Sequence, residues 1–215
     1  MRKLPAALLC LATVYSVGPV LAQQPATMRA SVMETHDGMT IGVDPWTLPS
    51  RYKEKFSKKT PLNGGVVGIH VSFRNNTDES MRVDLKSIRL VLQLEEDNRQ
   101  EISSLTAEEV ADAVLLKKSP KDPTARRLPL PIPGSTPKPN RDKNWDNLKG
   151  ECQNAGVPST VVAAHSTMEG LLYFDLRGQM DLLQNAHLYV PNLSVMGTNQ
   201  QLLYFEIDLG HAATD

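Results

Sequence analysis

Histidine and cysteine are the residues from which a metal or thiolate site would be built. None of the five histidines has the spacing of a zinc-binding pair: they are His36, His70, His165, His187 and His211. Cys152 is the single cysteine after residue 22, and one thiol cannot form a thiolate site. We therefore expect no metal site and no cofactor. His70 and His187 are expected at exposed positions of strands, and His165 in a turn.

Catalysis by a nucleophile would need a serine or cysteine on a strained turn beside a positioned base. No Gly-x-Ser-x-Gly sequence occurs. The run Asn63-Gly64-Gly65 lacks the Gly-Lys of a phosphate loop, so it predicts a turn. Asp175, Asp181 and Asp208 suit calcium, but they form no Asp-x-Asp loop. We predict that the protein is not an enzyme; the alternative is a secreted hydrolase whose site is assembled from residues distant in sequence.

Three tyrosines are the candidates for a binding surface. Tyr173, Tyr189 and Tyr204 each alternate with core residues of a predicted strand and therefore point away from the core. If their strands are neighbours, the rings line one outer face of a sheet, where they would bind a glycan or an extended peptide. The alternative, which we favour, is that the rings pack beneath a helix at 106–118 or beneath a proline-rich run.

The strand pattern is organised around the stretch 64–80, GGVVGIHVSFRNNTDES. Apolar residues alternate along it with a period of two, which is typical of a strand with one buried face. The polar run 75–80 predicts a turn, and alternation at 81–85 predicts a partner strand. The apolar parity then shifts by one residue, which predicts a bulge or corner at Lys86-Ser87.

Further strands flank this central pair. Residues 27–43 predict a hairpin that turns at Asp37-Gly38. The segments 170–176, 186–190 and 203–209 alternate as well and predict three strands of a second sheet, with Leu203 on the core face. Phe73 and Phe174 should then be core residues from facing strands.

One helix is predicted at 106–118. Thr106 and Glu109 have the spacing of a capping box, and Leu105 and Val110 that of a hydrophobic staple. A short helical turn within 50–60 should present Tyr52 and Phe56 to the core. The run 119–147 holds seven prolines and predicts a polyproline connector, with Trp145 in a loop that packs back on the fold. Helix and proline-rich insertion together occupy 104–158.

The first 22 residues resemble a secretory signal peptide. Arg2 and Lys3 precede a short apolar run, and Val20 and Ala22 suit cleavage between Ala22 and Gln23. We expect a periplasmic or secreted protein with no transmembrane segment after leader removal. The whole chain has 23 basic and 24 acidic residues. Loss of Arg2 and Lys3 with the leader leaves 21 basic and 24 acidic residues. No basic stripe is present, so nucleic acid is not an expected partner.

Three stretches, 71–85, 165–176 and 201–209, resemble a family of exported bacterial immunoglobulin-like domains of unknown function. The Asn-x-Thr-Asp turn at 75–78 matches that family, as do Gly170, Leu172 and Phe174 of the later strand. The resemblance implies an all-β protein with an immunoglobulin-like antiparallel β-sandwich over 23–215, one covering helix and a proline-rich insertion. By analogy it implies a non-catalytic interaction module of the bacterial cell envelope, with an unknown protein or glycan partner.

Overall fold

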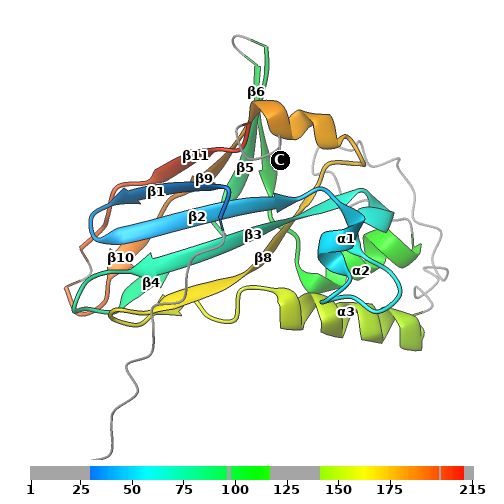
Figure 1. The fold of residues 1–215 in the computed structure, drawn as a ribbon, viewed down its shortest axis with the longest axis horizontal. Helices are drawn as coiled ribbons and strands as arrows, with labels where there is room; N and C mark the ends of the chain where they lie inside the picture. Colours follow the sequence, from blue (N-terminus) through cyan, green and yellow to red (C-terminus); the bar gives the residue numbers. More distant parts are fainter. Residues whose placement is uncertain (1–29, 96–97, 117–140, 199, 211–215) are drawn as a thin grey trace, which may run out of the picture.

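The computed structural model describes residues 30–95, 98–116, 141–198 and 200–210. The predicted signal peptide, its cleavage point between Ala22 and Gln23, and the proline-rich run as far as residue 140 lie outside these ranges. The described part is mostly antiparallel β-sheet with a few helices, which confirms the mostly-β class (Figure 1).

Sheet A has the strand order β1-β2-β3-β8, and all its neighbours are antiparallel. Its strands are β1 (Val32–His36), β2 (Met39–Trp46), β3 (Val66–Asn75) and β8 (Thr167–Asp175). Asp37 and Gly38 join β1 to β2 with φ of 49° and 75°, the left-handed pair that a type I′ turn requires. The predicted first hairpin and the predicted central strand are therefore confirmed.

Two further sheets lie across the core from sheet A. Sheet B is ordered β10-β4-β7 and sheet C β11-β9-β5-β6. Their strands are β4 (Met81–Val83), β5 (Arg89–Glu95), β6 (Asn98–Ser103), β7 (Val161–Val162), β9 (Ala186–Val190), β10 (Leu193–Val195) and β11 (Phe205–Asp208). The main hydrophobic core takes residues from all three sheets. The predicted corner at Lys86-Ser87 is a turn that ends β4 and leads into β5.

Two predicted strand pairings are wrong. The turn at 75–80 does not fold the chain back beside β3; it carries the chain from sheet A to sheet B, where β4 pairs with β10 and β7. Likewise β8 joins β3 in sheet A, whereas β9 and β11 pair in sheet C. Phe73 and Phe174 are both fully buried, as predicted, but they belong to neighbouring strands of one sheet rather than to facing strands. Alternation identifies a buried face, but it carries no information about which strand lies next to it.

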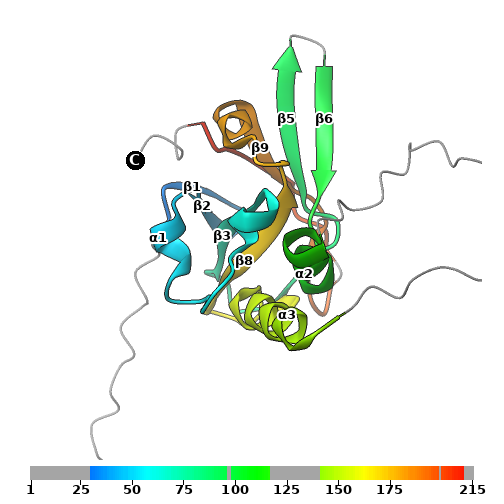
Figure 2. The ribbon, with the colours of Figure 1, turned by 90° about the vertical axis from the view of Figure 1, so that its right-hand side faces the viewer.

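The helices cover the outer face of sheet A near one end. They are α1 (Pro49–Tyr52), α2 (Ala107–Leu116) and α3 (Lys143–Ala155), with the 3₁₀ helix η1 (Pro61–Gly64). A second 3₁₀ helix, η2 (Met180–Asn185), lies instead against β5 and β9, with Leu183 in the main core. Helices α2 and α3 lie side by side in Figure 2. The capping box of α2 is confirmed, because Thr106 N–H donates to Glu109 Oε2 at 2.8 Å and Glu109 N–H donates to Thr106 Oγ1 at 3.3 Å.

Helix α3 corrects the prediction of a single covering helix. Trp145 packs back on the fold as expected, but from a helix rather than from a loop. Asp142 caps α3 by accepting hydrogen bonds from the backbone N–H groups of Asn144 and Trp145, both at 3.0 Å. Within the described part of the chain, no helix combines the length and apolar character needed to cross a membrane.

The covering helices enclose a second hydrophobic core on the outer face of sheet A. Tyr52 and Phe56 are both buried in it, with ring centroids 5.7 Å apart, which confirms that this short helical segment presents its rings to the fold. Tyr52 Oη donates to the carbonyl of Trp46 and accepts from the N–H of Gly68, both at 2.8 Å. Here β8 is buried on both faces, since Leu171 and Tyr173 face the helices.

Candidate functional site

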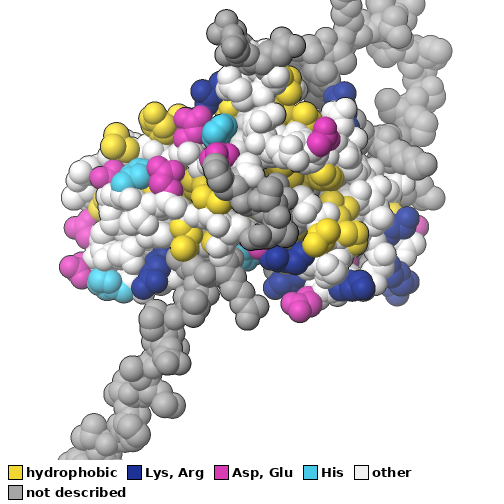
Figure 3. All heavy atoms as spheres, turned by 45° about the horizontal axis from the view of Figure 1, so that its top comes forward, with side chains coloured by type: hydrophobic (Ala, Val, Ile, Leu, Met, Phe, Trp, Pro, Cys, Tyr) yellow, Lys and Arg dark blue, Asp and Glu magenta, His cyan; other side chains and the backbone are white. Residues whose placement is uncertain are grey.

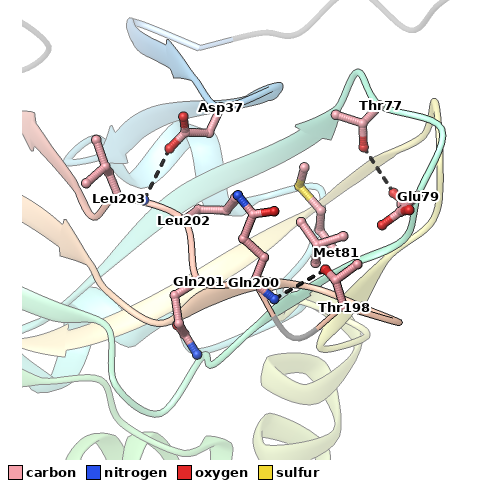
Figure 4. A pocket seen from close by; sticks show the side chains of 10 residues that line it. Asp37, Thr77, Glu79, Met81, Thr198, Gln200, Gln201, Leu202 and Leu203 are labelled. Carbon is pink, nitrogen blue, oxygen red and sulfur yellow. Dashed lines mark hydrogen bonds between the residues drawn. The ribbon is translucent and has the colours of Figure 1, made fainter.

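A hollow of about 760 Å³ lies at the end of the sheets opposite to the helices. We call it the end cavity. Three connections form its walls: the β1–β2 turn, the β3–β4 turn and the chain between β10 and β11 (Figure 4). Their polar contributors are Asp37, Thr77, Glu79, Thr198, Gln200 and Gln201. The apolar residues that line the hollow are Met81, Val195, Leu202 and Leu203, of which Met81 is only 1 % exposed.

Hydrogen bonds tie the three connections into a ring. Asn76 N–H donates to the carbonyl of Gly38 at 2.8 Å, which joins the first two turns. Met196 N–H donates to the carbonyl of Ser80 at 2.8 Å, and Leu203 N–H donates to Asp37 Oδ2 at 3.2 Å. Each connection is therefore bonded to the other two. A cavity held in this way needs little ordering when a ligand enters, which favours affinity.

Gly38 is required by this arrangement for two reasons. Its φ of 75° is strained for any residue with a side chain. A Cβ at Gly38 would also lie 2.3 Å from Thr77 Cγ2, so the two turns touch here without room for a methyl group. The left-handed backbone of the turn and the close contact with Thr77 therefore both require glycine at position 38.

Asn75 holds the β3–β4 turn from inside and is almost fully buried. Its Nδ2 donates to the carbonyls of Glu79 at 2.6 Å and Ala163 at 3.2 Å, and its Oδ1 accepts from Thr77 N–H at 3.0 Å and Thr77 Oγ1 at 2.8 Å. The Asn-x-Thr-Asp turn thus becomes a fixed part of the cavity wall. A buried amide that uses both its donor and its acceptor rigidifies the loop around it.

The end cavity carries negative charge. Asp37 and Glu79 are acidic, and none of the described residues that line it is lysine or arginine. Figure 3 shows acidic and histidine side chains along the left-hand end of the molecule, where the turns lie, and most lysine and arginine side chains at the right-hand end. Arg82 follows Met81 but takes the opposite parity of β4 and is exposed, whereas Met81 is buried.

The three candidate tyrosines separate into two places. Tyr173 is 3 % exposed, and its hydroxyl donates to the carbonyl of Cys152 at 3.0 Å within the second core, which agrees with the packing interpretation. Tyr189 of β9 and Tyr204, just before β11, lie together with ring centroids 5.4 Å apart, and Tyr204 is 54 % exposed. Two of the three rings therefore share one surface, on the outer side of sheet C, and the third does not.

Leu203 was predicted on the core face and is instead 68 % exposed. The reason is that β11 begins only at Phe205, and the preceding chain pairs with β10 instead: Leu202 N–H donates to the carbonyl of Leu193 at 2.9 Å. Leu202 takes the place against the main core, and Leu203 turns outward to the cavity. Tyr204 follows directly, so the exposed tyrosine stands next in the chain to the cavity wall.

The histidines occupy different settings. His165 lies in a turn, as predicted, and its Nε2 is 2.7 Å from Asp78 Oδ1. This exposed pair lines neither the end cavity nor the smaller hollow described below. His36 stacks on Phe205 with ring centroids 3.6 Å apart. His70 was expected to be exposed but is half-buried and stacks on Trp46, and burial lowers its pKa.

Among the described residues, no group of three or more histidine, cysteine, aspartate or glutamate residues is arranged so that it could hold a metal ion. Two of the three aspartates considered for calcium accept hydrogen bonds from backbone N–H groups of their own loops. Asp175 Oδ1 accepts from Arg177 N–H at 2.9 Å, and Asp208 Oδ1 accepts from Gly210 N–H at 2.8 Å.

A smaller hollow of about 290 Å³ lies beside the C-terminal end of α3, lined by Cys152, Tyr173 and Lys86 among others. Cys152 is 1 % exposed, and burial raises the pKa of its thiol to about 12. A thiol in this state stays protonated and is a poor nucleophile, as expected for a structural cysteine.

Comparison with known proteins gives little to add. No family model matches the chain, and no curated protein sequence matches it. Among solved structures, it is similar to a functionally unknown protein from Listeria monocytogenes EGD-e, at 13 % sequence identity and a TM-score of 0.33. That match covers 74 % of this chain and 70 % of the other.

Sequence reasoning missed most of the end cavity. Asp37-Gly38 and the turn at 75–78 were recognised as turns, but nothing in their sequence shows that they meet. The 200–202 segment carries no strand or turn motif, and its position depends on pairing with β10. Helix α3, in contrast, had a readable signal: Asp142 as the N-cap, then apolar residues at Trp145, Leu148 and Cys152.

Proposed function

We propose that the chain is a non-catalytic binding module with an immunoglobulin-like β-sandwich, acting outside the cytoplasm in the periplasm or as a secreted protein of the bacterial cell envelope. The end cavity carries this proposal. Its walls are loops at one end of stacked sheets, cross-bonded to one another, which is a common arrangement for binding sites presented by a rigid scaffold. The leader-like residues 1–22 and the family resemblance support the location.

The ligand class that we propose is a glycan or an extended peptide. The exposed Tyr204, its neighbour Tyr189 and the exposed Leu203 offer aromatic and aliphatic surface next to the cavity. The cavity itself adds amide and hydroxyl groups from Gln200, Thr198 and others. Rings with polar tips next to hydrogen-bonding groups suit ligands that are partly apolar and rich in donors and acceptors.

The experiment uses residues 23–215 as a purified protein on a glycan array and an extended-peptide library, with capture from envelope extract and mass spectrometry. We expect at least one class to bind, and Tyr204→Ala to weaken that binding about tenfold while the melting temperature stays within about 1 °C. Leu48→Ala is the matched control, because Leu48 is 55 % exposed but lies beside α1, away from the cavity.

Two results would overturn the proposal. One is that neither class binds at millimolar concentration. The other is that Tyr204→Ala and Leu48→Ala weaken binding equally, which would show that the contacts are unspecific. The hydrolase alternative calls for a histidine, a carboxylate and a serine in one pocket. The pair of His165 and Asp78 is exposed instead, and the adjacent Ser166 donates its hydroxyl to the carbonyl of Ala163 at 2.8 Å.

A further inference from the structure

The segment 48–60, which contains α1, carries an uneven share of the positive charge. We call it the basic segment. It has five basic residues and one acidic residue, Glu54, so its net charge is +4. The whole chain has a net charge of −1, which leaves −5 for all other residues together. The basic residues are all exposed, and they are Arg51, Lys53, Lys55, Lys58 and Lys59.

The fold fixes the direction in which the basic segment faces. The rings of Tyr52 and Phe56 are buried, and Phe56 N–H donates to the carbonyl of Tyr52 at 2.9 Å, as in one turn of helix. Ser57 Oγ donates to Glu151 Oε1 of α3 at 2.6 Å, which ties the end of this turn to the neighbouring helix. Because residues four apart share one face of a helical turn, the residues between the two buried rings point away from the core. The basic side chains are therefore presented to solvent by an anchored segment.

The charges of the four lysines are not neutralised by any described residue. Arg51 pairs with Asp44, whereas the lysine side chains form no ion pair and no hydrogen bond within the described part of the chain. Arg51 and Lys59 are eight residues apart, so their Cα atoms lie within about 30 Å of each other even in an extended chain. An anionic surface meets all these charges at once, whereas a single small anion reaches only some of them.

An exposed leucine accompanies the charges. Leu48 directly precedes α1 and is 55 % exposed, and the next residue, Pro49, is exposed as well. Apolar side chains beside basic ones suit an anionic bilayer, because the apolar group enters the headgroup boundary while the cations lie among the phosphates. Nucleic acid fits less well, because Leu48 would have no partner there and the rings of Tyr52 and Phe56, which could stack on bases, are buried.

From these observations we propose that the basic segment docks on an anionic phospholipid bilayer. The lysines lie among the headgroup phosphates, and the Leu48 side chain enters the headgroup boundary. The end cavity lies at the opposite end of the sheets from α1, so a molecule bound in this way holds the cavity away from the bilayer (Figures 1 and 3). This inference goes beyond the proposed binding function and does not depend on the ligand of the cavity.

The test is co-sedimentation of residues 23–215 with two kinds of vesicle. One is pure phosphatidylcholine, and the other contains about 40 % phosphatidylglycerol, which gives it a negative surface potential. Each lysine near such a surface strengthens binding about fivefold, so four lysines should give half-maximal binding at about 1 mM accessible lipid. Neutral vesicles should bind at least about tenfold more weakly, and about 500 mM NaCl should release the protein from the anionic ones.

The variants change exposed side chains, so the melting temperature should stay within about 1 °C of the native value. Lys58→Gln combined with Lys59→Gln should weaken binding to anionic vesicles about twentyfold. Leu48→Ala should weaken it about threefold without altering the dependence on salt, because no charge is removed. Arg82→Gln combined with Lys86→Gln is the matched control, since these exposed residues lie in β4 of sheet B and in the turn after it, across the core from sheet A. It should change binding less than about twofold.

Three results would overturn the proposal: no binding to anionic vesicles at about 5 mM lipid, equal binding to neutral vesicles, or equal effects of the two double variants. Double-stranded DNA or an anionic polysaccharide that binds as tightly as the anionic vesicles would show that the partner is not a membrane. Failure of the proposed function is a separate outcome. The variant at Lys58 and Lys59 should bind glycan or peptide ligands as the native protein does, and Tyr204→Ala should bind vesicles as the native protein does.

Discussion

The two ends of sheet A are built in opposite ways. At one end α2 and α3 cover the outer face, and Tyr52, Trp145, Cys152 and Tyr173 are buried there. At the other end no described helix covers the turns, which bond to one another and leave a hollow between them. The covered end contains buried hydroxyl groups whose bonds stay within the protein, whereas the open end presents carboxylates, amides and hydroxyls to solvent.

The charge of the two ends differs as well. Basic side chains gather at the helix-covered end, where the sequence of α1 and the residues after it supplies Arg51, Lys53, Lys55, Lys58 and Lys59. The end cavity has acidic lining residues. The same sheet supports a packed interior at one end and a hollow with acidic lining residues at the other.

The largest expected effect concerns the core that both ends share. Phe174 belongs to the half of β8 beneath the helices, and Phe73 to the half of β3 that leads into the cavity turn; both are fully buried. Truncation of either to alanine should lower the free energy of unfolding by about 3–5 kcal/mol. Urea denaturation followed by near- and far-UV circular dichroism measures it.

Both variants should unfold in one transition, because the main core is continuous between the ends. A loss below about 1 kcal/mol would contradict the assignment of that phenylalanine to the core. Two separate transitions in Phe174→Ala, with only the helical signal lost in the first, would show that the helix-covered end unfolds on its own. The comparison would then be one between two folding units.

A smaller effect is expected where α3 meets β8. A Cβ at Gly170 would lie 2.5 Å from the backbone of Gly156 and Val157, the segment that leaves α3. Backbone atoms at that distance cannot be moved by a rotamer change, so Gly170→Ala should destabilise the protein by about 1–3 kcal/mol. The melting temperature and the helical circular dichroism signal report this change.

Gly150→Ala is the matched control. Gly150 lies within α3, and a Cβ there meets nothing within 4 Å, so alanine should stabilise by about 1 kcal/mol through helix propensity alone. If Gly170→Ala is as stable as the native protein, the contact between α3 and sheet A is looser than described. Binding at the end cavity should be unchanged in both variants, because neither residue lines it.

The longer strands with apolar alternation and the first hairpin could be predicted because their signals are local, whereas β6, β7 and β10 were not predicted. Asp37-Gly38 specifies its own turn, and alternation at Val67 to Phe73 specifies its own buried face. The pairing of strands could not be predicted, because the partners of β3 and β4 depend on contacts far along the chain. Tyr173 has the predicted parity, and the face opposite the core is covered by helices, which agrees with the packing interpretation favoured from the sequence.

The candidate site was less predictable than the fold. Two of its turns had sequence signals, but the cavity exists only because Asn76, Ser80 and Asp37 bond across connections distant in sequence. A surface shared by the tyrosines was the less favoured alternative, and it holds only for Tyr189 of β9 and Tyr204, which directly precedes the neighbouring strand β11. A site assembled from loop ends has no spacing motif, because its geometry comes from the tertiary contacts that bring the loops together.

The smallest expected effect is a loss of stability at alkaline pH that comes from the helix-covered end. Burial raises the pKa of the Cys152 thiol to about 12 and also raises the pKa of the Tyr52 and Tyr173 hydroxyls. In the unfolded chain a thiol ionises near pH 8.5, so its stabilising contribution is complete below that pH and is lost as the pH rises toward the folded pKa. One thiol contributes at most about 1.4 kcal/mol per pH unit in this window. Urea denaturation at pH 8, 9 and 10 should show the decline, and Cys152→Ala should flatten it before the tyrosines begin to ionise. A slope that is identical in the native protein and Cys152→Ala, or rapid reaction of the native thiol with a disulfide reagent at pH 8, would show that this end is not sealed from water and that the contrast between the two ends is overstated.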